Sequence, residues 1–345
     1  MSSEKIYDSI FDAFRVIAPN SPLLDLEKGK PHFFHRTNEY NLIDMGTYIG
    51  AYAGNPFGRL FRGEYKEYPN SKASIYRGNS DEIIIDKIRI IEFKNILQTF
   101  PQIQYAIKDH ANVDYLALAQ HYELHTWMID LTSEPEIAAY FATHEWIKGV
   151  PTPVETGIGR IRGINIILPN SKIHYIGLQC FKRPGLQAAY GIEMDEDEDL
   201  GNRGWTVRFK QNATASRIIH QNFHFDYKEF EKHKSLIDIS MHPELFTQNS
   251  WLMPDEEIAE VADKVKNGKE LSQAAIEEYT NLLNPKEKDE VFAALSRNDI
   301  KITEQPVYVL GQDRIIELEK EYKNKPYGDV QLHARLTCKP NAIRN

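Results

Sequence analysis

The stretch Leu118-Ala119-Gln120-His121-Tyr122-Glu123-Leu124-His125-Thr126, continued by Asp130-Leu131-Thr132-Ser133-Glu134-Pro135, holds the densest run of chemically distinctive residues. Two arginine-glycine segments precede it, Leu60-Phe61-Arg62-Gly63-Glu64 and Tyr76-Arg77-Gly78. A helical pattern over residues 112–122 ends at this stretch, and Pro135 suits the start of another helix. Gln120 and His121 therefore lie at a helix end, where a side chain can face a pocket.

Helical and strand-like patterns surround this stretch. Apolar spacing predicts helices over 9–17, 83–100, 133–149, 255–267, 271–283, 284–296 and 313–322, and strands over 161–168, 205–209 and 307–310. The pattern predicts an α+β fold with a mixed central sheet, flanking helices and a largely helical C-terminal part. We expect an N-terminal segment at 1–55, a central domain at 56–225 and a mainly helical region at 226–345.

The composition excludes several classes of protein. The 345 residues are 41% apolar and 26% charged and carry a formal net charge of −9, which is typical of a folded soluble protein. Two cysteines exclude a disulfide framework. We find no apolar run long enough for a signal peptide or a membrane span, so we expect a cytoplasmic protein without membrane contact. The acidic balance does not indicate a broad nucleic-acid surface.

Arg62 and Arg77 are candidate anion-binding residues. Each precedes a glycine, which lets the backbone turn sharply or lie close to a ligand. A guanidinium offers paired donors that fit a phosphate or a carboxylate. A structural ion pair with a carboxylate is the alternative for Arg62.

His121 and Asp130 are candidate catalytic residues. Apolar neighbours predict that Asp130 is partly buried, and a buried carboxylate needs a partner such as Arg62 or His121. The alternatives are a structural hydrogen bond for His121 and helix capping for Asp130. His121 and His125 are four residues apart, but without an HExxH motif we expect no metal. The chain also lacks the GxxxxGK[ST], GxGxxG and GxSxG motifs.

These segments resemble the FRG-domain family, whose pattern is an early FRG motif, a stretch like LAQHYGLPTRLLDWT-x-NP, and an alanine- and aromatic-rich helix. The matching residues are Phe61-Arg62-Gly63, Ala119-Gln120-His121-Tyr122, Thr126, Asp130, Thr132, Pro135 and Tyr140-Phe141-Ala142. The resemblance covers about residues 56–225. Glu123, His125 and Trp127 stand where the family usually has Gly, Pro and Arg. The loss of Gly and Pro predicts a differently shaped turn, and the loss of the Arg at position 127 argues against an activity that needs a second cation there.

A weaker similarity is to ADP-ribosyltransferases, in which the Arg of a Tyr-Arg-Gly or similar segment often engages the NAD phosphates. The two resemblances together imply a cofactor-binding set of Arg62, Gly63, Arg77, Gln120, Thr126 and Gln187. They imply His121, Asp130 and Glu193 as catalytic residues, with a surface role as the alternative for Glu193, which borders an acidic run. The segment 217–223 is the alternative to Gln187.

Two functions follow as hypotheses. The first is an NAD-handling enzyme of the ADP-ribosyltransferase type, in which Arg62 binds phosphate, His121 orients the ribose, and Asp130 holds His121 or acts as the acid. The second is a sensor that binds a nucleotide or a protein without turnover, with a protein partner on the helices after Asp255. A toxin or anti-phage effector is a biological role that the family resemblance makes conceivable for this chain.

Overall fold

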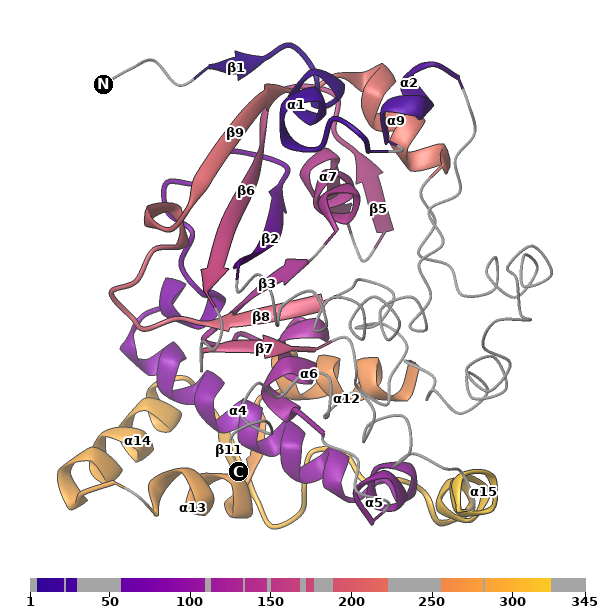
Figure 1. Ribbon diagram of the computed structural model, residues 1–345. Coiled ribbons are helices and arrows are strands. Elements are labelled where there is room, and N and C mark those ends of the chain that lie inside the picture. Colours follow the sequence, from indigo (N-terminus) through magenta and orange to yellow (C-terminus); the bar gives the residue numbers. More distant parts are fainter. Residues whose placement is uncertain are drawn as a thin grey trace, which may run out of the picture.

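The computed structural model describes residues 5–21, 23–29, 57–108, 113–132, 134–147, 150–167, 172–176, 189–222, 256–281 and 283–323. Within these ranges it has eleven α-helices and a seven-stranded mixed sheet (Figure 1). The predicted α+β class is confirmed. Gln187 lies outside the described residues. Among the described helices, none has the length and apolar character that crossing a membrane would require.

The central sheet has seven strands among the described residues, and two neighbouring strands in it, β2 (Phe57–Glu64) and β3 (Met128–Thr132), are paired at only one position. The order of the sheet is β1 (Ile6–Tyr7), β9 (Trp205–Lys210), β6 (Ile158–Ile167), β2, β3, β8 (Ala189–Glu193) and β7 (Ile173–Tyr175). Strand β2 pairs with β6 along its whole length but with β3 only at Phe61 and Thr132. In Figure 1, β9, β6 and β2 therefore run up the molecule, whereas β3, β8 and β7 run across it.

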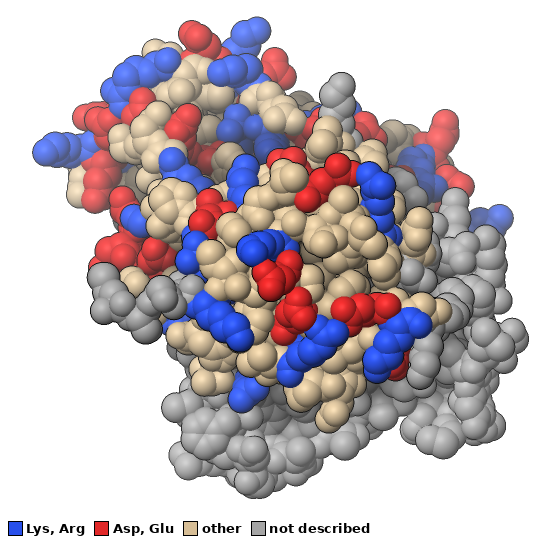
Figure 2. All heavy atoms as spheres, turned by 90° about the horizontal axis from the view of Figure 1, so that it is seen from above, with Lys and Arg blue, Asp and Glu red and all other residues tan. Residues whose placement is uncertain are grey.

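Four of the described helices cover one face of the half of the central sheet that is formed by β2, β6 and β9. They are α1 (Ile10–Ile17), α2 (Leu23–Glu27), α7 (Pro135–Thr143) and α9 (Ala213–Asn222). Phe61, Ile161 and Phe209 of the strands share a buried cluster with Phe14 of α1 and Tyr140 of α7. On the outside, the face in Figure 2 shows Lys and Arg interspersed with Asp and Glu.

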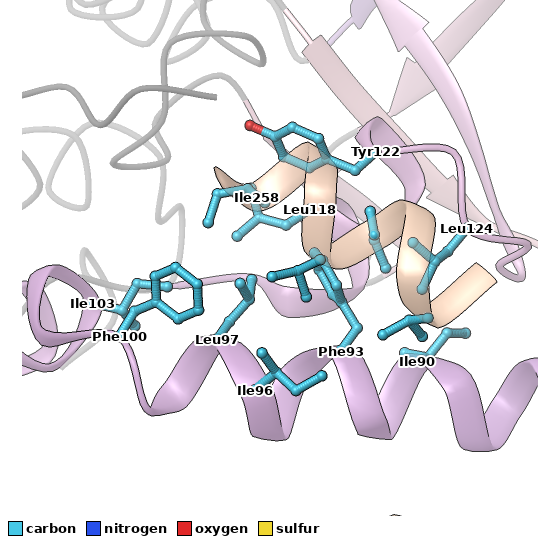
Figure 3. Packing of buried hydrophobic residues seen from close by; sticks show 14 of the residues in the cluster. Ile90, Phe93, Ile96, Leu97, Phe100, Ile103, Leu118, Tyr122, Leu124 and Ile258 are labelled. Carbon is cyan, nitrogen blue, oxygen red and sulfur yellow. The ribbon is translucent and has the colours of Figure 1, made fainter. Parts of the chain in front are cut away.

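Helix α4 (Ser80–Gln98) is the long axis of the second half of the molecule. A capping box at Asn79 and Glu82 starts it. Around it lie α5 (Pro101–Lys108), α6 (Tyr115–His121), α12 (Glu256–Asn267), α13 (Gln273–Thr280), α14 (Pro285–Arg297) and α15 (Gln312–Tyr322). Figure 3 shows Phe93 and Leu97 of α4 pointing toward Leu118 of α6 and Ile258 of α12, in one buried cluster.

One predicted element is wrong in part, and another is wrong. The helix expected over 133–149 ends at Thr143, where the Thr143 hydroxyl donates to Ala139 O and the His144 ring bonds to Tyr140 O. Residues from His144 then form β4 (His144–Ile147), which pairs with β5 (Val150–Pro153). The strand expected over 307–310 is an irregular segment that packs against the α4 cluster. The only parallel pair found in the described C-terminal part is β10 (Glu270–Ser272) with β11 (Lys301–Thr303).

Candidate functional site

A cavity of about 420 Å³ lies where β2 and β3 separate. Its walls include six of the predicted site residues: Arg62, Gly63, Arg77, Gln120, His121 and Asp130. They come from β2, from the 3-10 turn at Ser74–Arg77, from the end of α6 and from β3. Its volume is in the range of small-molecule sites. Residues from four separate segments thus converge on one pocket.

Arg62 is held at this cavity by a buried carboxylate. Its Nη1 donates to the backbone oxygen of Asp130 at 2.9 Å, and its Nε lies 3.5 Å from Oε1 of Glu64. Glu64 is 4% exposed and also accepts from Arg162 Nε at 3.1 Å and from Ser71 Oγ at 2.7 Å. The structural ion pair considered for Arg62 is therefore present. Within the described part of the chain, the buried Nε of Arg62 has no hydrogen-bond acceptor.

The Asp130 carboxylate is oriented by a short chain of hydrogen bonds. The Thr126 hydroxyl donates to Oε1 of Gln120, which leaves the Gln120 amide nitrogen to donate to Oδ2 of Asp130 at 2.9 Å. Thr126 is itself anchored, because its backbone N–H donates to Ser74 Oγ at 3.1 Å. Oδ1 of Asp130 is buried, and no hydrogen-bond donor reaches it from the described residues. Thr126 thus acts through Gln120 and does not line the cavity.

His121 lies beside Asp130 without a hydrogen bond to it. Nε2 of His121 is 3.9 Å from Oδ1 of Asp130, beyond hydrogen-bonding distance. The His121 side chain is 3% exposed. The pair predicted from the sequence is therefore close in space but is not arranged for direct proton transfer.

Gly63 is required by the packing of the sheet. A Cβ atom at this position would lie 1.8 Å from the backbone oxygen of Ala138 and 2.7 Å from the backbone nitrogen of Ala142, both on α7. Side chains alternate along β2, so Phe61 and Gly63 face α7 and Arg62 faces the other side. The missing side chain brings α7 against the strand beside Arg62.

Two more cations line the cavity with Arg62. Arg77 donates from Nε and Nη2 to the backbone oxygen of Lys72 at 3.1 and 2.7 Å. Desolvation and the neighbouring charge of Arg62 hold the pKa of the Arg77 guanidinium below its usual range. Lys266 of α12 also lines the cavity, with Nζ 3.7 Å from Oε2 of Glu123. The sequence analysis missed Lys266, because no local pattern shows that α12 packs near this site.

An aromatic pair forms part of the same wall. Phe141 of α7 and Trp146 of β4 stack with ring centroids 5.2 Å apart and an interplanar angle of 21°. Both are partly exposed and line the cavity. The sequence analysis quoted Phe141 as a motif residue but did not assign either ring to the site. A stacking surface beside guanidinium groups is suited to a flat ring with attached phosphates.

The three departures from the family pattern each contact residues outside the motif. Glu123 has a φ of 69°, the left-handed conformation that glycine adopts most easily. Nδ1 of His125 lies 2.8 Å from Oδ2 of Asp86 on α4. Trp127 packs against the α4 cluster.

Glu193 is not among the residues that line the cavity. It accepts from Nε2 of His174 at 2.6 Å, while Nδ1 of His174 lies 2.8 Å from Oδ2 of Asp114. Asp114 caps the start of α6. The hydrogen bond to Asp114, supported by Glu193, raises the pKa of His174. Glu193 therefore belongs to a bridge between β8, β7 and α6. Among the described residues, no group of three His, Cys, Asp or Glu side chains is placed to hold a metal ion.

Comparison with protein families assigns the segment that carries the cavity. Residues 58–149 match the family model of the FRG domain. An FRG domain is present. The match covers Arg62, Arg77, Gln120, His121 and Asp130, whereas Lys266 lies outside it. The FRG domain thus contributes most of the cavity wall, and the C-terminal region adds a cation. No curated protein and no solved structure matches the chain.

Proposed function

We propose that the FRG domain binds a nucleotide in the β2–β3 cavity and cleaves NAD at its N-glycosidic bond. The observation that carries this proposal is the convergence of Arg62, Arg77, Asp130 and the Phe141–Trp146 pair on one cavity. The guanidinium groups suit the pyrophosphate and the aromatic pair suits a base. Nε of Arg62 and Oδ1 of Asp130 are buried without a hydrogen-bond partner among the described residues, which supports a polar ligand at this place.

Asp130 supplies the electrostatic part of the reaction. The bond between C1′ of the ribose and the nicotinamide nitrogen breaks, and its electron pair leaves with nicotinamide. C1′ becomes positively charged, and a carboxylate oriented in advance stabilises that charge. Water or another nucleophile then adds to C1′ and loses a proton. Gln120 and Thr126 are positioning residues that hold the carboxylate.

The test is incubation of the full chain with NAD, with nicotinamide release followed by mass spectrometry. Asp130→Asn should lower the rate by about 100-fold or more, since it removes one preorganised charge. NAD binding by this variant should be retained. Arg77→Ala should weaken binding. Arg15→Ala is the matched control, because Arg15 pairs with Asp12 and Glu27 at the surface and does not line the cavity. Nicotinamide release that is unchanged in Asp130→Asn would refute the assigned role.

Binding without turnover is the second candidate function. It is favoured by the 3.9 Å gap between His121 and Asp130, because these two residues do not form a hydrogen-bonded acid–base pair. A sensor of this kind would show NAD-dependent thermal stabilisation that Arg62→Ala and Arg77→Ala abolish, with no nicotinamide released. If the chain neither binds NAD nor releases nicotinamide, both functions are refuted.

A further inference from the structure

A second cavity of about 430 Å³ lies on the other side of Arg77. It is enclosed by the 3-10 turn at Ser74–Arg77, the first half of α4 and two C-terminal segments that contribute Lys269 and Asn298. Arg77, Ser74 and His125 line both cavities. The second cavity contains Arg89 and Lys269, which are absent from the walls of the first. It therefore joins the FRG domain to the C-terminal region.

The carboxylates in this cavity are already engaged. Asp86 accepts from Nη1 of Arg89 at 2.9 Å and lies 2.8 Å from Nδ1 of His125. Glu82 accepts from the backbone N–H of Asn79 at 2.8 Å as part of the capping box of α4. Neither carboxylate forms an ion pair with Arg77 or Lys269 in the described part of the chain.

The cationic side chains in this cavity have N–H groups that can still donate hydrogen bonds to a ligand. The hydrogen bonds of Arg77 go to the backbone oxygen of Lys72, and Nζ of Lys269 donates to the backbone oxygen of Asn298 at 3.0 Å. Arg89 donates from Nη2 to the backbone oxygen of Gly268 at 3.2 Å, and its buried Nε has no acceptor among the described residues. Three cations against two engaged carboxylates leave the cavity positive. Such a site favours a compact anion with several acceptor oxygens.

We propose that this second cavity is a phosphate-binding subsite, in which Arg77, Arg89 and Lys269 hold a phosphate or diphosphate group. Lys269 is exposed and carries its charge on a flexible four-carbon side chain, whereas Arg89 is held in place by Asp86. Because Arg77 also lines the first cavity, the two subsites are neighbours. The anion is either a further phosphate of the nucleotide in the first cavity or a separate phosphorylated small molecule.

The test is calorimetric titration of the full chain with inorganic pyrophosphate. Lys269→Ala should weaken binding by about tenfold, the usual effect of losing one charge-assisted hydrogen bond. Lys286→Ala is the matched control, because Lys286 is also exposed and does not line the cavity. Affinity that is the same in Lys269→Ala and in the parent chain overturns the proposal. The proposal is also overturned if pyrophosphate affinity is lost only in Arg62→Ala, because that result places the anion in the first cavity.

A second arm separates the two sources of the anion and keeps this proposal apart from the enzymatic one. If pyrophosphate still binds when the first cavity is saturated with NAD, the subsite takes a separate molecule. If NAD excludes pyrophosphate in the parent chain, the same nucleotide reaches both cavities. If the chain does not cleave NAD but still binds pyrophosphate in a way that depends on Lys269, only the proposed enzymatic function is refuted.

Discussion

Gly63 shows how a residue without a side chain can shape the site. In the FRG motif, a residue with a guanidinium group is followed directly by glycine, which has no side chain. Arg62 faces the cavity, and Gly63 lets the backbone of α7 approach the strand. Glu64 then buries its carboxylate beneath Arg62. Arg62 and Glu64 therefore lie on one face of the strand and Gly63 on the other, because successive side chains in a strand point to opposite faces.

Gly63→Ala should destabilise the protein strongly. The added Cβ would overlap the Ala138 oxygen, which belongs to the helix backbone and cannot rotate away. We expect a loss of about 2–3 kcal/mol in the free energy of unfolding, as for overpacked cores. Urea denaturation followed by circular dichroism measures it. Gly311→Ala is the control, since nothing lies within 4 Å of a Cβ there. Equal stability of the two variants would contradict this role of Gly63.

The His174 bridge should make stability depend on pH. The hydrogen bond to Asp114 raises the pKa of His174, so its contribution is complete below the unfolded value of 6.5 and is lost as pH rises through the folded pKa. The pKa of Asp114 is lowered, because the hydrogen bonds from His174 and from Ala117 outweigh burial. The contribution of Asp114 is therefore lost on acidification.

The measurement is the free energy of unfolding of the parent chain and of His174→Gln between pH 4 and pH 9. The difference between them should be largest in mildly acidic solution and should shrink toward pH 9. A difference that does not change with pH would show that His174 contributes through packing alone.

At the scale of elements, α4 connects the FRG domain to the C-terminal region through a buried carboxylate. Glu92 is 0% exposed. Its Oε2 accepts from the backbone N–H of Ser272 at 3.2 Å and from the Ser272 hydroxyl, and its Oε1 accepts from Val307 N at 2.9 Å. Ser272 caps α13, so a single side chain on α4 orders the start of α13 and the segment at Val307.

Glu92→Ala should loosen α13 and the segment after β11. It leaves three donors without their acceptor, two of them buried and one partly buried, which costs about 3 kcal/mol in the free energy of unfolding. Hydrogen exchange should accelerate in α13 more than in α7. Glu278→Ala is the control, because Glu278 pairs with Lys94 at the surface and such pairs contribute about 0–1 kcal/mol. Uniform exchange across both helices would contradict a local role for Glu92.

At the scale of the whole molecule, the FRG domain and the C-terminal region share two hydrophobic clusters. Phe93 and Phe100 pack in one cluster with Val261 and Tyr322, and Ile88 packs in another with Ile276. Both clusters combine side chains of α4 or α5 with side chains from the C-terminal region. The boundary expected at 225 and 226 stays a prediction about independent folding, and this packing argues that the region after it supports the FRG domain.

A chain that ends at residue 225 should lose cooperative folding. Truncation uncovers the apolar faces of α4 that contact α12, α13 and α14. Burial contributes about 25 cal/mol per Å² of apolar surface, and a typical domain is stable by only about 5–15 kcal/mol, so we expect the loss to exceed that margin. Differential scanning calorimetry should show one transition for the full chain and none for the truncated chain. A truncated chain with an unchanged Tm would show that the two regions fold separately.

Local patterns determined the elements and the candidate residues. Apolar spacing predicted helices over 83–100 and 284–296, and the structure has them as α4 and α14, each of which begins after a capping box. The motif residues Arg62, Gln120 and Asp130 were recognised in the same way. An irregular segment at 307–310 was mistaken for a strand, since packing against α4 and pairing in a sheet require the same apolar residues.

Only the tertiary structure decided which of these residues meet. It brought Lys266, Phe141 and Trp146 to the cavity and placed Glu193 in the His174 bridge. It also made the second cavity, whose Arg89 and Lys269 are 180 residues apart in the sequence. Contacts between distant segments depend on where β2 and β3 separate and on how α12 packs against α4. The sequence by itself therefore determined the α+β elements and the motif residues, and long-range packing decided the composition of the site.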